Sequence, residues 1–241
     1  MTTCPPFDKI DNHSESQWIC DIREVFEALG YLHDRGFEHL CMDEMHSFVY
    51  TRNESNSNRT IKMFKGLPSL RPDQESQGNQ RIKFLQFLEA CGAEKLVNYG
   101  SFKQLVLERA DLNAILKHPF VLETAKQRVT SILATNEMMF GLHNNQRSFL
   151  DSILCHNFQG FKWKDVANSN RARFGTFNFH TNQYENNWFG FARFIRNYVE
   201  HLRDSNSLQH VDYSVADTVL SDLFPGILGW LYTCALLALR K

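Results

Sequence analysis

The amino-acid sequence predicts a mainly α-helical protein. Apolar residues recur at helical intervals in several segments, whereas the alternation of apolar and polar residues that is typical of a half-buried strand is scarce. The chain has 241 residues, of which 43% are hydrophobic, so it can form one large domain or two small ones with a genuine core. We find no internal repeat and no low-complexity array.

The clearest early element is an amphipathic helix over residues 14–36. Ser14 and Gln17 have the spacing of a capping box, apolar residues follow at helical intervals, and Gly36 ends the pattern. Residues 51–80 are polar and predict a surface loop that contributes little to the core. Helical patterning then returns in four segments, over residues 81–91, 102–116, 121–139 and 148–158.

Charge, cysteine spacing and the N-terminus argue against a globally basic nucleic-acid-binding protein, a cysteine-based zinc or redox site and a secreted protein. Twenty-six Lys and Arg against twenty-seven Asp and Glu give a net charge of −1, so any contact with nucleic acid must come from a local basic cluster. The six cysteines lack the paired spacing of zinc or redox sites and are expected to be reduced and mostly buried. The N-terminus lacks the layout of a signal peptide, so we expect a cytoplasmic protein.

The apolar segment over residues 223–239 has two interpretations. It is uncharged and close to the lower length limit of a membrane span, so a short C-terminal anchor at the endoplasmic reticulum surface is one. Pro225, Gly226 and Gly229 interrupt its first part, and this favours the other interpretation, a buried terminal helix. We therefore expect no membrane partner.

Residues 28–50, ALGYLHDRGFEHLCMDEMHSFVY, resemble the helix and catalytic loop of a protein kinase. His39 falls on the histidine of that loop, but Cys41 replaces the proton-accepting aspartate and His46 replaces the metal-binding asparagine. IKMFKG at 61–66 stands where Asp-Phe-Gly is expected and has no aspartate, and no glycine-rich phosphate loop precedes it. The resemblance implies a degenerate kinase loop, with no kinase activity, no metal and no cofactor.

Later segments resemble, in matching order, the inositol-requiring kinase/endoribonucleases and the related RNase L. This resemblance implies a degenerate protein kinase C-lobe, or pseudokinase, over residues 1–116 and an all-helical ribonuclease domain of the KEN type over 117–241. The segments that carry it are residues 112–133 with a His-Pro-Phe, Trp163, residues 190–202 with Arg-Asn-x-x-x-His, and residues 215–232.

The helix expected over residues 189–202 carries the candidate catalytic residues. Its apolar stripe predicts docking on neighbouring helices, and Asn197 and His201, four residues apart, project from one edge of it. Family resemblance assigns Arg196, Asn197 and His201 to the nuclease site: Arg196 to the phosphate, Asn197 to the phosphate or the histidine, and His201 to proton donation. The family's tyrosine, its partner in proton transfer, falls on Gln183 here; Tyr184, one place later, is the fourth candidate if a loop absorbs the shift, and otherwise the partner is lost.

Two hypotheses about function follow from this resemblance. The first is a metal-independent endoribonuclease that cleaves RNA stem-loops in the unfolded-protein response or in RNA decay. The alternative is a non-enzymatic regulator that dimerises with a full-length relative, because the tyrosine is displaced, Gly190 replaces an aspartate and Leu202 replaces an aromatic residue of the family pattern. The implied partners are stem-loop RNA and a second copy or a relative of this chain.

Overall fold

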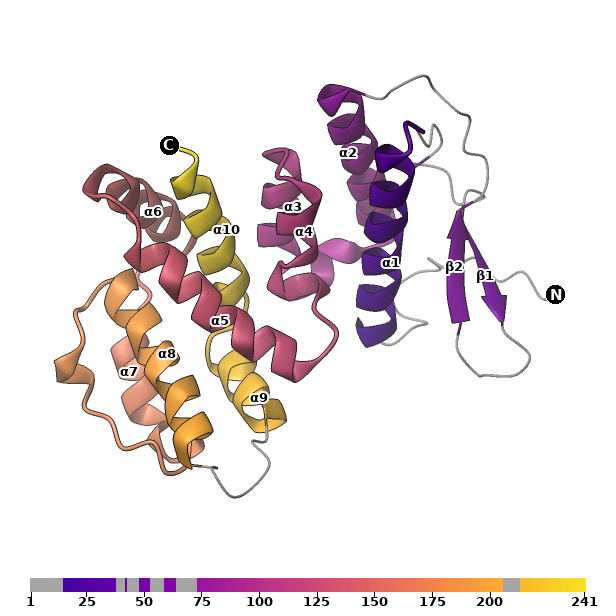
Figure 1. Ribbon diagram of the computed structural model, residues 1–241. Helices are drawn as coiled ribbons and strands as arrows, with labels where there is room; N and C mark the ends of the chain where they lie inside the picture. Colours follow the sequence, from indigo (N-terminus) through magenta and orange to yellow (C-terminus); the bar gives the residue numbers. More distant parts are fainter. Residues whose placement is uncertain (1–14, 38–41, 43–47, 53–58, 64–72, 206–212) are drawn as a thin grey trace. The chain divides into compact units, whose positions relative to one another are not determined.

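The computed structural model describes residues 15–37, 42, 48–52, 59–63, 73–205 and 213–241 (Figure 1). The chain divides into two compact units, an N-terminal unit of residues 1–123 and a C-terminal unit of residues 124–241. The described part is mainly helical, which confirms the predicted fold class at that level. His39, Cys41 and His46 of the kinase-like loop lie outside the described residues.

The N-terminal unit consists of helices and one pair of strands in its described part. Its elements are α1 (Glu15–Asp34), β1 (Phe48–Arg52), β2 (Arg59–Met63), α2 (Gln74–Ala90), the 3-10 turn η3 (Ala93–Lys95), α3 (Tyr99–Leu107), α4 (Leu112–Leu116) and the 3-10 turn η4 (Pro119–Val121). β1 and β2 are antiparallel, with Phe48 opposite Met63 and Arg52 opposite Arg59. α1 matches the predicted helix closely.

Two predictions for this unit are wrong in detail. The loop predicted over 51–80 contains β2 and the first turns of α2, because strand pairing depends on a partner strand and because Asp73 caps a polar helix, its side chain accepting a hydrogen bond from Ser76 N at 2.7 Å. The helix predicted over 102–116 is two helices. The helical conformation is interrupted at Arg109, which has a φ of 53°, and Asp111 caps the second helix.

The core of the N-terminal unit is aromatic. The ring of Phe26 contacts two others: its centroid lies 5.6 Å from that of Phe84 and 5.4 Å from that of Phe102. Phe102 in turn lies 4.9 Å from Phe120. Phe120 belongs to the His-Pro-Phe segment, so this segment packs inside the N-terminal unit, and the division between the units falls a few residues after the boundary expected at 116/117.

The C-terminal unit is helical throughout its described part. Its elements are α5 (Ala125–Phe140), α6 (Asn144–Asn157), α7 (Trp163–Ser169), the 3-10 turns η5 (Arg171–Phe174) and η6 (Thr181–Gln183), α8 (Trp188–Ser205), α9 (Tyr213–Leu223) and α10 (Ile227–Leu239). α5 contacts α8, α9 and α10, and α10 also packs on α6 (Figure 1). The helices predicted over 121–139 and 148–158 correspond to α5 and α6.

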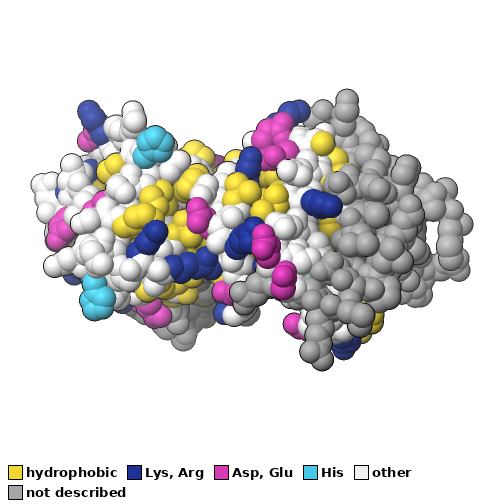
Figure 2. Space-filling view, turned by 90° about the horizontal axis from the view of Figure 1, so that it is seen from above, with side chains coloured by type: hydrophobic (Ala, Val, Ile, Leu, Met, Phe, Trp, Pro, Cys, Tyr) yellow, Lys and Arg dark blue, Asp and Glu magenta, His cyan; other side chains and the backbone are white. Residues whose placement is uncertain are grey.

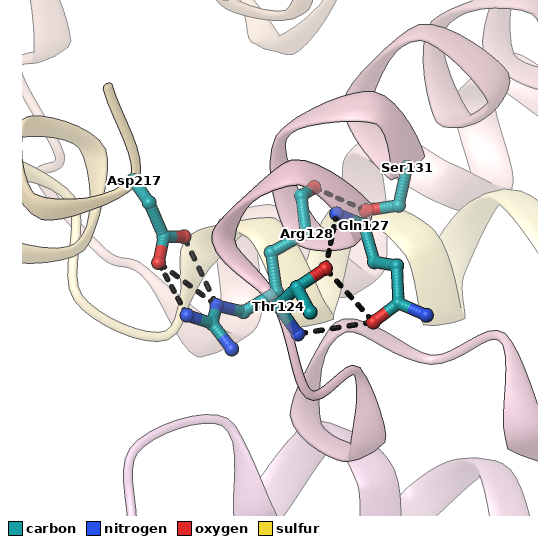
Figure 3. A network of polar contacts seen from close by, with 5 residues as sticks. All are labelled: Thr124, Gln127, Arg128, Ser131 and Asp217. Atoms are coloured by element: carbon teal, nitrogen blue, oxygen red, sulfur yellow. Dashed lines mark hydrogen bonds and ion pairs between the residues drawn. The ribbon is translucent and has the colours of Figure 1, made fainter. Parts of the chain in front are cut away.

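The start of α5 is fixed by a network of polar contacts (Figure 3). Thr124 and Gln127 form a capping box, in which Thr124 Oγ1 accepts from Gln127 N at 3.2 Å and Gln127 Oε1 accepts from Thr124 N at 3.0 Å. Arg128, one residue further, donates from Nε and Nη2 to Asp217 of α9 at 2.9 and 2.6 Å. The forked pair connects two helices that lie far apart in the sequence.

The apolar C-terminal segment forms α10, which is mostly buried in the C-terminal unit. Cys234 and Ala235 are fully buried, and burial raises the pKa of the Cys234 thiol to about 12. Among the described residues, no single helix has the length and hydropathy of a membrane span. α9 and α10 meet both criteria only as a pair, which is bent by 86°.

Candidate functional site

α8 presents one apolar face and one polar edge, as predicted. The apolar face is buried in the core of the C-terminal unit and consists of Phe191, Phe194, Ile195 and Tyr198. The polar edge carries Arg196, Asn197 and His201, which are partly exposed. Burial of the apolar stripe fixes the rotation of the helix, and this rotation brings the polar edge to the surface.

The segment between η5 and α8 packs against α8 through a row of aromatic side chains. Phe179 lies 4.9 Å from Phe194, and Phe174 lies 5.1 Å from Tyr198, both in edge-to-face geometry. At the end of the segment, the ring of Tyr184 lies 5.6 Å from Phe194. The aromatic contacts therefore place Tyr184 beside the polar edge of α8.

Polar contacts with α7 and η5 hold the same segment in place. Lys164 Nζ donates to the backbone oxygen of Tyr184 at 2.6 Å, and Asn168 Nδ2 donates to Thr181 Oγ1 at 3.0 Å. Arg171 donates to a backbone oxygen of the segment and lies over the ring of Phe179, 4.5 Å from its centroid. The backbone around Tyr184 is thus fixed from both sides.

The first turn of α8 explains why a glycine occupies position 190. Asn187 caps the helix, its Oδ1 accepting from Gly190 N at 2.8 Å. A Cβ at position 190 would overlap backbone atoms of Glu185, so no side chain fits. Gly190, which stands where the family pattern has an aspartate, is therefore the point at which the segment before α8 crosses the helix.

Tyr184, Asn197 and Arg196 form a hydrogen-bonded chain. Asn197 Nδ2 donates to Tyr184 OH at 3.1 Å, and Asn197 Oδ1 accepts from Arg196 Nη1 at 3.4 Å. Arg196 also pairs with Glu200, at 2.8 Å between Nη2 and Oε1. The hydroxyl beside Asn197 belongs to Tyr184, whereas Gln183, which stands at the position of the family's tyrosine, is exposed.

His201 lies one helical turn beyond Asn197. Its Nε2 is 3.3 Å from Thr176 Oγ1, and its ring centroid is 5.4 Å from that of Phe177. Thr176 and Phe177 come from the beginning of the segment that ends at Tyr184. The structure therefore places all four predicted residues where α8 meets this segment, with His201 at one end of the site and Tyr184 at the other.

Two hollows at the surface of the C-terminal unit adjoin this site. One has a volume of about 260 Å³ and is lined by Asn136, Glu137, Phe140, Arg193 and Arg196. The other has a volume of about 330 Å³ and is lined by Phe140, Arg147, Asp151, Gln183, Tyr184, Glu185, Asn187, Phe189, Gly190 and Arg193. The larger hollow lies at the lower end of the usual volume range of ligand pockets, and the smaller lies just below that range. The two hollows share Phe140 and Arg193.

The C-terminal unit carries the local positive charge that the sequence as a whole lacks. Twelve Lys and Arg against nine Asp and Glu give residues 124–241 a net charge of +3, whereas residues 1–123 carry −4. On the face shown in Figure 2, Lys and Arg, Asp and Glu, and exposed hydrophobic side chains are intermixed. The net charge of the C-terminal unit favours an anionic ligand over a cationic one.

Sequence reasoning missed three residues that line the hollows. Arg193 stands three positions before Arg196, so helical spacing alone would have placed it on the same side of α8. Arg147 and Asp151 come from α6, and no local pattern connects them with α8. As for metal ligands, no cluster of three or more His, Cys, Asp or Glu side chains occurs within the described ranges.

Comparison with known proteins returned no relatives. No family model matches the sequence, and no curated protein and no solved structure shows significant similarity to it. Functional interpretation therefore rests on the geometry around Tyr184, Asn197 and His201 and on the order of the sequence motifs.

Proposed function

We propose that this protein is a metal-independent endoribonuclease that cleaves stem-loop RNA. In this proposal, residues 117–241 form a nuclease domain of the KEN type, and residues 1–116 are a degenerate protein kinase C-lobe without kinase activity. The observation that carries the proposal is the hydrogen bond from Asn197 to the hydroxyl of Tyr184, with His201 one turn along the same helix. This arrangement combines two groups able to exchange protons with two donors able to bind a phosphate.

The proposed reaction is an internal transesterification of the RNA backbone. The 2′-hydroxyl attacks the adjacent phosphorus, and its proton passes to a base on the protein. The bond from phosphorus to the 5′-oxygen breaks, and an acid protonates that oxygen. The products are a 2′,3′-cyclic phosphate and a free 5′-hydroxyl, and the reaction needs no water in this step.

Each of the four side chains has a role that its surroundings support. His201 protonates the departing 5′-oxygen, since imidazole can carry a proton near neutral pH. Tyr184 is the partner in proton transfer, and the hydrogen bond from Asn197 holds its hydroxyl group in position. Arg196 supplies a forked donor to the scissile phosphate, which carries additional charge in the transition state.

Cleavage of a hairpin RNA in the presence of EDTA tests the proposal. We expect the native chain to release fragments that end in a 2′,3′-cyclic phosphate, detected by end-group analysis. His201→Ala should lower the rate by roughly 10²–10⁴, the usual contribution of a general acid. His180→Ala, at an exposed histidine of the same unit, is the matched control and should cleave at the native rate. Cleavage that survives His201→Ala would contradict the assignment.

The ion pair between Arg196 and Glu200 favours a second candidate function. Glu200 neutralises the guanidinium that would bind the phosphate, as would suit a chain that has lost turnover. In this alternative, the protein is a non-enzymatic regulator that dimerises with a full-length kinase/endoribonuclease relative.

Glu200→Gln separates the two candidates. If the chain is a nuclease, removing the carboxylate should raise the affinity for RNA and leave cleavage dependent on His201. If it is a regulator, neither native chain nor variant cleaves, and the chain co-purifies with a full-length relative. The absence of both cleavage and a mixed dimer would remove both candidates.

A further inference from the structure

The larger of the two surface hollows lies directly beside the candidate nuclease site. Its volume is about 330 Å³, and Tyr184, whose hydroxyl bonds to Asn197, forms part of its lining. α6 contributes Arg147 and Asp151, and the start of α8 contributes Gly190 and Arg193. A ligand bound at Arg196 could therefore reach this hollow by passing along Tyr184 or Arg193.

Asp151 lines this hollow and carries a hydrogen-bond acceptor that has no donor among the described residues. This acceptor, Oδ1, is buried. Burial raises the pKa of this carboxyl, and the charge of Arg147 only partly opposes the effect. A carboxylate oxygen that has lost water without gaining a donor has a high free energy, which a ligand with an N–H group would lower.

The walls of the hollow are suited to a flat aromatic ligand. Phe140 is 45% exposed and stands edge-to-face with Phe189, at 6.3 Å between ring centroids. The guanidinium of Arg147 lies over the ring of Phe189, 4.9 Å from its centroid. Exposed aromatic and guanidinium planes are the surfaces on which unpaired nucleobases stack.

Arg193 is placed to bind a phosphate next to the hollow. It is exposed, lines both hollows, and forms no hydrogen bond or ion pair that the described residues show. It precedes Arg196 by three residues, about 4.5 Å along the helix axis at 1.5 Å per residue. Two arginines at this spacing can contact neighbouring phosphates of one strand.

We infer that the hollow is a subsite for one unpaired nucleobase next to the scissile phosphate, with Asp151 accepting a hydrogen bond from an amino group on that base. The inference rests on the proposed nuclease function. Asp151 and Glu185 line the hollow together with Arg147 and Arg193, so its interior offers a phosphate group no net positive charge. The base therefore enters the hollow, and the backbone stays at Arg193 and Arg196.

The carboxylate of Asp151 also sets a preference among bases. Adenine, cytosine and guanine carry an amino group that can donate to it. Uracil has one ring N–H between two carbonyl oxygens, and these oxygens would face the negative charge. Asp151 is thus a specificity-determining residue that disfavours uracil.

A set of hairpins with each of the four bases at the unpaired positions flanking the cleavage point tests the subsite. For the native chain, uracil at one of these positions should lower kcat/KM roughly tenfold, within the range known for one base contact. Asp151→Asn should remove the penalty on uracil, because the amide can accept from the ring N–H and donate to a carbonyl oxygen. Asp165→Asn, at an exposed aspartate of α7, should keep the native order.

Binding of hairpins with a 2′-deoxy nucleotide at the cleavage point tests the subsite independently of cleavage. Fluorescence anisotropy should show the same base order in affinity even where no cleavage occurs, and this result would support the subsite if the nuclease proposal fails. Equal kcat/KM and equal affinity for all four bases in both native chain and Asp151→Asn would overturn the subsite, while cleavage dependent on His201 would still stand.

Discussion

The two units use the same polar residue types in opposite ways. In the N-terminal unit, His118 is fully buried; its Nδ1 accepts from Phe120 N at 3.1 Å and its Nε2 is 3.2 Å from Ser101 Oγ. In the C-terminal unit, His201 is partly exposed and its ring nitrogen contacts the hydroxyl of Thr176. One histidine makes its hydrogen bonds inside the core, and the other lies at the surface.

The arginines repeat this contrast. Arg81 is 8% exposed and donates to the backbone oxygen of Ala110 at 3.0 Å, and burial lowers the pKa of its guanidinium. The side chain of Arg196 is 43% exposed, and its polar contacts within the described residues are with the side chains of Asn197 and Glu200. A buried polar group with a backbone partner is fixed by the fold, whereas an exposed one with side-chain partners can exchange them for water at little cost.

The largest expected difference in stability is between alanine variants of the two histidines. His118→Ala removes a buried ring and two hydrogen bonds, so we expect the free energy of unfolding to fall by about 2–4 kcal/mol. His201→Ala removes a partly solvated ring and should change it by less than about 1 kcal/mol. Urea denaturation of both variants measures the difference. Equal losses would break the comparison between the two units.

The next largest difference in stability is expected between alanine variants of two helical glycines, Gly190 and Gly30. At Gly190 a methyl group would overlap backbone atoms of Glu185, so Gly190→Ala should lower stability by about 1–3 kcal/mol and displace Tyr184. At Gly30 in α1 it would meet the end of the Leu112 side chain, which can rotate away. Gly30→Ala should therefore lose less, since alanine also favours the helix. Thermal denaturation tests the order, and a larger loss at Gly30 would contradict it.

Two ion pairs of the C-terminal unit provide a smaller test of burial. Arg128 and Asp217 are 30% and 14% exposed, and we expect a double-mutant cycle to give a coupling of about 1–2 kcal/mol. Arg173 and Asp222 have the same 2.6 Å separation but are 39% and 54% exposed, and their coupling should lie below about 1 kcal/mol. A stronger coupling in the second pair would show that burial does not decide the contribution.

The smallest expected effect concerns pH and Asp151. Because burial raises the pKa of this carboxyl above the usual 3.8, the folded chain keeps a proton that the unfolded chain has lost, and stability falls as pH rises through this window. Asp151→Asn should therefore raise the free energy of unfolding at pH 7 by less than about 1 kcal/mol, since the carboxyl is partly solvated.

Denaturation of native chain and Asp151→Asn at pH 3 and pH 7 measures this linkage. The difference between them should shrink at the lower pH, where both side chains are neutral. A variant that is less stable than the native chain at pH 7 would mean that the carboxylate stabilises the fold.

Local sequence patterns predicted the elements that depend on local interactions. α1 follows from helical periodicity ended by Gly36, and the buried stripe of α8 follows from its spacing. The strands β1 and β2 were missed, because a strand is stabilised by hydrogen bonds to a partner that periodicity does not identify. The division between the units falls after Glu123, a few residues beyond the expected 116/117, because Phe120 packs on a ring from α3.

The sequence by itself determined that Asn197 and His201 share one edge of a helix, because residues four positions apart lie one above the other, whereas Arg196 points about 100° away from Asn197. Only the tertiary structure decided that Tyr184, and not Gln183, meets Asn197, and that Asp151 of α6 lines a hollow beside them. These contacts depend on how aromatic rings from distant segments pack around Phe194, and packing of this kind has no signal in any single stretch of chain.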